Sequence, residues 1–200
     1  MFVATALCLA KFTYLENDIH TLSVANGYVG QNDEEDLLIF DRRFGYKVDT
    51  VHDLLNTWGP DGRLRYLLIE LVDVLIYFPS YRGTFLVLTN QLLSTFVARF
   101  PSLSFVRRFA LLPIVLAMID FAEDLGQVTF TVVYDRWGDD HDLLTNVYWR
   151  YTVVASSWAN QAKWWTVRAG SSFLLLVSVL VAVHAVGGAL LGGGKVKKQS

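Results

Sequence analysis

The sequence has a single cysteine and four prolines in 200 residues, and it lacks the common catalytic signatures. Because Cys8 stands alone, an internal disulfide and a thiolate cluster for zinc or iron–sulfur are excluded. It contains no G-x-S-x-G elbow, H-E-x-x-H pair, P-loop or dinucleotide fingerprint, and its formal net charge is only -2. We therefore expect a protein that is not an enzyme of a known motif class, that binds no nucleic acid and that has no metal site.

Apolar residues dominate what is present. They make up 53% of the chain, and 14% of the residues are aromatic. This composition predicts an all-α membrane protein, a four-helix transmembrane bundle with a small mixed α/β module between spans 1 and 2. The expected parts are a short first span at 1–15, an outside-facing module at 16–63, a three-helix membrane region at 64–194 with an acidic loop at 135–145, and a basic tail at 195–200.

Two further features refine this division. The last span has no formal charge from about 169 to 194, and the stretch before it, from about 147, can continue the same helix toward solvent. Within the outside module, 49–62 reads as a short amphipathic helix that ends at Gly59-Pro60. Its apolar side is expected to pack on the bundle or to lie at the lipid surface, and it consists of Val51, Leu54, Leu55 and Trp58.

Charge sorting gives the expected orientation. The stretch 91–108 holds three arginines and no acid, and the tail holds three lysines and no acid, so both are expected inside. By contrast, 11–65 has ten acids against six bases, which places it outside. Phospholipids such as cardiolipin are the expected partners of Arg107, Arg108 and the basic tail.

Charged residues also lie inside the expected spans, and we call this set the polar seam. A carboxylate at the bilayer centre costs about 2.5 to 3.5 kcal/mol on insertion scales, so it needs a polar neighbour. Spacings of three and four place the acids of each helix on one face. Nine residues separate the arginine from the nearest acid of its own helix, which rules out a simple intrahelical pair. The members are Glu70, Asp73, Arg82, Asp120, Glu123 and Asp124.

Four interpretations of the polar seam follow. The acids can lock the helices together through hydrogen bonds, form a proton or cation path, or meet basic residues of another subunit. The D-x-x-E-D run at 120–124 can also ligate magnesium for lipid chemistry, although it lies deep for that purpose. The structural lock is favoured because no return path of acids runs through the whole bundle.

Two other groups can carry chemistry. His184 lies in the last span, where a neutral imidazole can ligate a haem iron or a chlorophyll magnesium, but a hydrogen bond to a neighbour is favoured over either cofactor. The acidic loop lacks the spacing of an EF-hand and is expected to face a basic partner. Its acids are Asp135, Asp139, Asp140 and Asp142.

The run FGYKVDTVHDLLNTWGPDGRLRYLLIE, followed by an apolar span and LLPIVLAMIDFAEDL, resembles a family of small four-helix membrane proteins of uncharacterised activity. The similarity covers about 44–123 and implies a four-span fold. It implies no activity and no catalytic residue. The short first span and Arg82 within the second helix depart from the family pattern.

Together these features predict an accessory, non-catalytic membrane subunit of a large respiratory or photosynthetic complex, contacting other membrane subunits through the intramembrane acids and the acidic outer face. The mitochondrial inner membrane is the expected location, in preference to the thylakoid, and bound lipids are expected. The alternatives are a proton- or cation-coupled transporter or channel that uses the intramembrane carboxylates, and a magnesium-dependent lipid-modifying enzyme.

Overall fold

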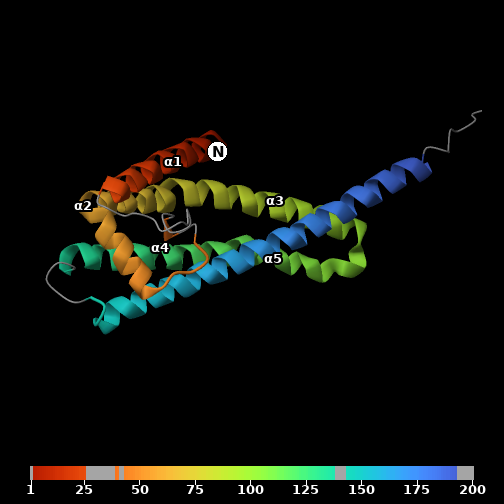
Figure 1. Ribbon diagram of the computed structural model, residues 1–200. Helices are drawn as coiled ribbons and strands as arrows, with labels where there is room; N and C mark the ends of the chain where they lie inside the picture. Colours follow the sequence, from red (N-terminus) through yellow and green to blue (C-terminus); the bar gives the residue numbers. More distant parts are fainter. Residues whose placement is uncertain (1, 26–38, 41–42, 138–142, 193–200) are drawn as a thin grey trace, which may run out of the picture.

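The computed structural model describes residues 2–25, 39–40, 43–137 and 143–192. The described residues form long helices that lie side by side (Figure 1). Their order is α1 (Phe2–Ala25), α2 (Val48–Val72), a π-helical turn η3 (Asp73–Tyr77), α3 (Phe78–Arg99), a 3-10 helix η4 (Pro101–Leu111), α4 (Leu112–Trp137) and α5 (Val147–Gly192).

The predicted α/β module is not supported, because the described part of 16–63 contains helix and no strand. α1 continues to Ala25 as one helix, beyond the end of the predicted first span. Leu15 and Ile19 are buried in the core. Asp18 of α1 forms an ion pair with Arg65 of α2. The α1 helix therefore packs against α2.

Gly59 bends α2 instead of ending it. Its backbone adopts φ 63°, a left-handed conformation that favours glycine, and Pro60 follows inside the helix. The short helix before this bend packs on the bundle through Leu55 and Trp58, which are almost completely buried. Of the two expected positions for this apolar side, the structure shows packing on the bundle and not a position at the lipid surface.

The core has two parts. Aromatic rings dominate the first, where Phe40 contacts Trp58, Tyr66 and Phe130 at centroid distances of 5.1 to 5.3 Å. The second mixes aliphatic and aromatic side chains and joins α3, η4 and α5 through residues such as Phe96, Val106 and Val177. Between these two clusters lies the polar seam.

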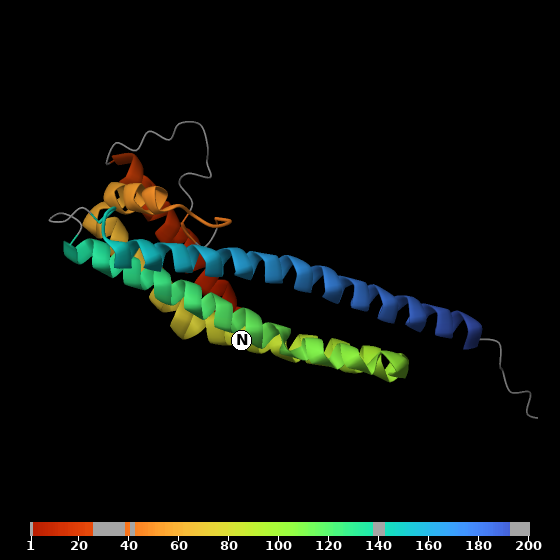
Figure 2. The same ribbon diagram turned by 90° about the horizontal axis from the view of Figure 1, so that it is seen from below.

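α4 and α5 run antiparallel in close contact, and α5 extends past the turn between α3 and α4 in both views (Figures 1 and 2). The continuation of the last span back to about 147 is confirmed, since α5 is a single helix of 46 residues. At 1.5 Å per residue, it is about 69 Å long.

Two helical stretches are long and apolar enough to cross a membrane, Pro101–Trp137 and Val147–Gly187. The prediction of four spans is not supported by the described residues. α2 and α3 do not qualify as spans because charged and polar side chains interrupt their apolar runs. Two apolar helices indicate association with a membrane.

Candidate functional site

The six residues of the polar seam come together at the middle of the helix bundle. Glu70 and Asp73 come from the end of α2 and the start of η3, Arg82 from α3 and the remaining acids from α4. All six side chains are buried, and Glu70 and Glu123 have no exposed surface. The predicted common face of each helix is therefore the face that turns inward.

Two cations pair with the acids of α4. Arg82 Nη2 lies 2.5 Å from Asp120 Oδ2, which joins α3 to α4. Lys163 Nζ of α5 lies 3.2 Å from Asp120 Oδ1 and 2.5 Å from Glu123 Oε2. Arg82 thus finds its counter-ion within the chain, but on another helix.

Amide groups satisfy the other oxygen of Glu123. Oε1 accepts hydrogen bonds from Gln127 Nε2 at 2.7 Å and from Asn160 Nδ2 at 2.6 Å. The hydroxyl of Tyr66 in turn donates to the Gln127 carbonyl. A continuous hydrogen-bonded network therefore links α2, α4 and α5. Such a network fixes the relative positions of helices because every buried polar group depends on its neighbours.

Asn160 also holds the segment before α2. Its Oδ1 accepts from the amide of Gly45 at 2.7 Å, and its Nδ2 is 3.3 Å from the carbonyl of Phe40. Next to it, Ser157 Oγ accepts from the amide of Tyr46 at 2.8 Å. These contacts attach residues 110 or more positions apart in the sequence.

Sequence reasoning missed Lys163, Asn160, Gln127 and Tyr66 as members of this site. A signal was present for α5, because Ser156, Asn160 and Lys163 are spaced by four and three residues and so share one helix face. That face is the one that contacts α4, where Ser156 Oγ donates to the carbonyl of Glu123 at 3.0 Å.

The π-helical turn η3 explains how Arg82 reaches the site. In a regular α-helix, Asp73 and Arg82 would lie on opposite faces. Pro79 has no amide hydrogen and its ring clashes with the carbonyl four residues earlier, so a regular helix is disfavoured here. A π turn holds more residues than an α turn and rotates the face that follows it. Arg82 consequently meets Asp120, beside Asp73.

Three carboxylates come especially close. Single oxygens of Asp73, Asp120 and Asp124 all lie within 4.8 Å of one another, a geometry that could hold a cation. Among the described residues, Arg82 and Lys163 pair with two of the five buried carboxylates of the seam, Asp120 and Glu123.

The remaining predicted residues lie away from the seam. Asp135 is half exposed and pairs with Arg63, whose Nη2 is 2.9 Å from Asp135 Oδ1. The other acids of the predicted loop, Asp139, Asp140 and Asp142, lie outside the described residues. Asp135 thus anchors α2 to α4 within the chain.

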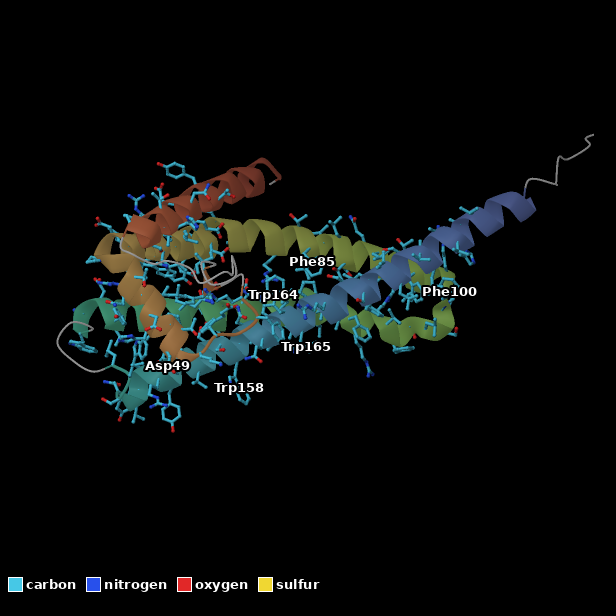
Figure 3. The ribbon with its side chains drawn as sticks, viewed as in Figure 1. Asp49, Phe85, Phe100, Trp158, Trp164 and Trp165 are labelled. Atoms are coloured by element: carbon cyan, nitrogen blue, oxygen red, sulfur yellow. The ribbon has the colours of Figure 1, made fainter. Side chains whose placement is uncertain are left out.

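His184 is exposed on α5, where its ring contacts Phe100 edge-on at 5.2 Å (Figure 3 labels Phe100). His52, by contrast, contacts Trp149 near the opposite end of α5. These two histidines cannot form a bis-histidine site, because 35 helical residues, about 52 Å, separate Trp149 from His184. The described contacts do not test the haem or chlorophyll alternative at His184, which the sequence favours less than a hydrogen bond to a neighbour.

Comparison with known protein families, curated proteins and solved structures found no match for this chain. The resemblance to four-helix membrane proteins therefore stays a prediction.

Proposed function

We propose that this chain is a non-catalytic, membrane-embedded subunit that packs against other proteins along α5. The proposal rests on a line of exposed positions that recur at alternate spacings of three and four residues, which we call the α5 stripe. Such spacing is typical of the contact face between packed helices. The stripe consists of Tyr148, Tyr151, Ala155, Trp158, Ala162, Trp165, Ala169, Ser172, Leu176, Val179, Val183 and Val186.

The length of the α5 stripe argues for a protein partner. From Tyr148 to Val186 it extends about 57 Å along the helix, whereas the hydrocarbon core of a bilayer is about 30 Å thick. Whichever stretch of α5 the lipid covers, the rest of the stripe lies outside the hydrocarbon. Exposed apolar side chains there need another protein surface.

The stripe also alternates large and small side chains. Trp158 and Trp165 are 72% and 62% exposed, and they lie between Ala155, Ala162 and Ala169. Trp158 projects from α5 away from the other helices (Figure 3). A partner helix can place its own side chains over the alanines and accept the tryptophans between its turns.

The polar seam supports the same role. Its ion pairs join α3, α4 and α5 to one another, as expected of a structural lock. Arg107 and Arg108 are exposed on η4, where they can contact lipid phosphates such as those of cardiolipin. The respiratory or photosynthetic setting, with the mitochondrial inner membrane favoured, is part of the proposal and comes from the sequence.

Native electrophoresis in mild detergent tests the proposal. The wild-type chain should migrate with a much larger assembly, whereas Trp158→Ser and Ala162→Trp should release it at its own mass of 22.6 kDa. The matched control is Met118→Ser, which alters a side chain 70% exposed on α4 and should leave the assembly intact. Wild-type chain migrating alone, or stripe variants that remain in the assembly, would contradict the proposal.

A proton- or cation-coupled transporter is the second candidate, and the approach of Asp73, Asp120 and Asp124 to within 4.8 Å favours it. In that role, the three carboxylates would exchange protons or bind the ion, and Arg82 would tune Asp120. Asp120→Asn should then abolish flux into liposomes while the chain remains folded. Flux equal to that of the wild type would reject this candidate.

A further inference from the structure

The α5 stripe has the spacing of one strand of a two-stranded coiled coil. With Tyr148 at heptad position a, its members fall alternately at positions a and d as far as Val186. Ser156 and Lys163, which contact α4, lie about 130° away around the helix axis. The stripe can therefore meet a partner helix while α5 keeps its contacts with the bundle.

One copy of the α5 stripe has both the large and the small side chains that a second copy needs. In a parallel coiled coil, a side chain at d inserts between two successive a side chains of the facing helix, beside its own counterpart. Trp158 of one copy would thus lie between Ala155 and Ala162 of the other. In the next heptad, Trp165 would lie between Ala162 and Ala169. The stripe is therefore complementary to itself in shape, as an interface with two-fold symmetry requires.

The charges beside the stripe agree with a second copy that runs in the same direction. Charged residues at positions e and g set the choice of partner in coiled coils. From 147 to 187, these positions of α5 carry a single charged residue, Arg168. Parallel pairing places Arg168 of one copy opposite Phe173 of the other, so the two guanidinium groups do not meet. Two copies inserted under the same charge rule also run parallel.

The exposed area of the α5 stripe matches what a stable dimer needs. Four of its aromatic side chains are 62% to 85% exposed, namely Tyr148, Tyr151, Trp158 and Trp165. An aromatic side chain buries about 150 to 250 Å², so these four offer about 400 to 700 Å² per copy. The aliphatic members from Leu176 to Val186 are 49% to 64% exposed and add to this area. Together they reach the value of about 800 Å² per partner that is typical of a specific interface.

We propose that the α5 stripe pairs with the same stripe of a second copy of this chain, in a parallel, in-register coiled coil. This pairing rests on the proposed function, because it names the protein partner of the stripe. The assembly proposed above then contains the chain in pairs. Trp158 and Trp165 provide the central contacts, since large aromatic side chains near the middle of an interface contribute most to binding.

Disulfide cross-linking of the full-length chain, in the membranes of cells that express it, tests the pairing. The background variant is Cys8→Ser, which leaves the chain without a cysteine, so one cysteine can be added at a time. In Ser172→Cys the new thiols face each other at position d, and oxidation should give a dimer of twice 22.6 kDa. Ser171→Cys is the matched control, because Ser171 is also exposed but points about 130° away from the stripe. It should stay monomeric.

A second cysteine position tests the direction and the register of the pair. Ala155→Cys lies at position a, about 26 Å from Ser172 along the helix, and it should also cross-link with itself. Two such distant positions can both meet their counterparts only when the helices run parallel and in register. Adding Trp158→Ser to Ser172→Cys should lower the cross-linked fraction by more than about tenfold, since it removes a central aromatic contact.

The outcomes separate this pairing from the proposed function. No dimer in Ser172→Cys, a dimer at only one of the two stripe positions, or equal cross-linking in Ser171→Cys would overturn the pairing. If native electrophoresis then still shows a large assembly that Trp158→Ser releases, the stripe binds a different protein and the proposed function stands. Dimers at both stripe positions in a chain that joins no larger assembly would support the pairing and contradict the proposed function.

Discussion

Lys163 of α5 lies 2.5 Å from Glu123 of α4, and the same ammonium group lies 3.2 Å from Asp120. Glu123 is completely buried and Lys163 is only 9% exposed. One cation thus bridges two acids that are three residues apart on the neighbouring helix. Because Asp120 also binds Arg82, Lys163 connects α5 to the pair between α3 and α4.

Replacing Lys163 with methionine should destabilise the fold strongly. The change leaves Glu123 buried without its counter-ion, and removing one partner of a buried pair costs about 3 to 5 kcal/mol. Denaturant unfolding in detergent micelles measures the loss. Arg150→Met, which removes an exposed cation from the same helix, should change the free energy of unfolding by less than about 0.5 kcal/mol.

The double variant Lys163→Met/Glu123→Gln should recover part of that loss. Neutralising Glu123 removes the uncompensated charge, so the two changes should be non-additive by about 0.5 to 3 kcal/mol. A double-mutant cycle on the same unfolding transition measures the coupling. Strict additivity would show that Lys163 and Glu123 do not act as a pair.

Gly126 sets the distance between α4 and α5. A Cβ at this position would lie 2.6 Å from the Cβ of Ser156, so Gly126→Ala should force the helices apart at a cost of about 1 to 3 kcal/mol. Gly83 is the matched control, since a Cβ there has no described neighbour within 4 Å. Gly83→Ala should stabilise α3 by up to about 1 kcal/mol, and equal melting temperatures for the two variants would contradict the close packing.

Gly59 should also resist substitution, for a reason of backbone conformation. Its φ of 63° costs a residue with a Cβ about 1 to 2 kcal/mol. Gly59→Ala should therefore lower stability in the same unfolding assay. Asn56→Ala, at an exposed helical position of α2, should not. A Gly59→Ala chain as stable as the wild type would indicate that α2 straightens without loss.

Much of the seam could be predicted because helical periodicity is local. The spacings within 70–73 and 120–124 correctly placed the acids on inward faces. The partners could not be predicted in the same way. Lys163 lies 40 residues from Glu123, and their meeting depends on the relative position of α4 and α5, which the contact at Gly126 helps to set. The spacing of Ser156, Asn160 and Lys163 marks one face of α5, but it does not show which acid of α4 Lys163 meets.

The number of spans was predicted less well for a related physical reason. A run of apolar residues indicates burial, but burial against lipid and burial against protein have the same pattern. Tyr66 and Ile69 are buried inside the bundle, so their apolar character says nothing of a membrane. The π turn before Arg82 was also beyond sequence reasoning, since Pro79 predicts a disturbance of the helix but not its form.

Asn160 should hold the segment that precedes α2 in place through hydrogen bonds to its backbone. Its side chain is completely buried and contacts Gly45, Phe40 and Glu123 at once. In Asn160→Ala the amide of Gly45 loses its acceptor, so hydrogen exchange at Gly45 should accelerate by more than about tenfold. Exchange at amides inside α4 should change less, because their acceptors are carbonyls of the same helix.

Asn160→Asp separates the role of the side-chain oxygen of Asn160, which accepts from Gly45, from that of its side-chain nitrogen, which donates to Glu123. The aspartate keeps an acceptor for the Gly45 amide but loses the donor that serves Glu123, and it adds a negative charge beside that acid. Slow exchange at Gly45 should therefore persist in Asn160→Asp if the chain folds, while the free energy of unfolding falls below that of Asn160→Ala because like charges meet in the seam. Fast exchange at Gly45 in a folded Asn160→Asp chain would show that this hydrogen bond does not hold the segment.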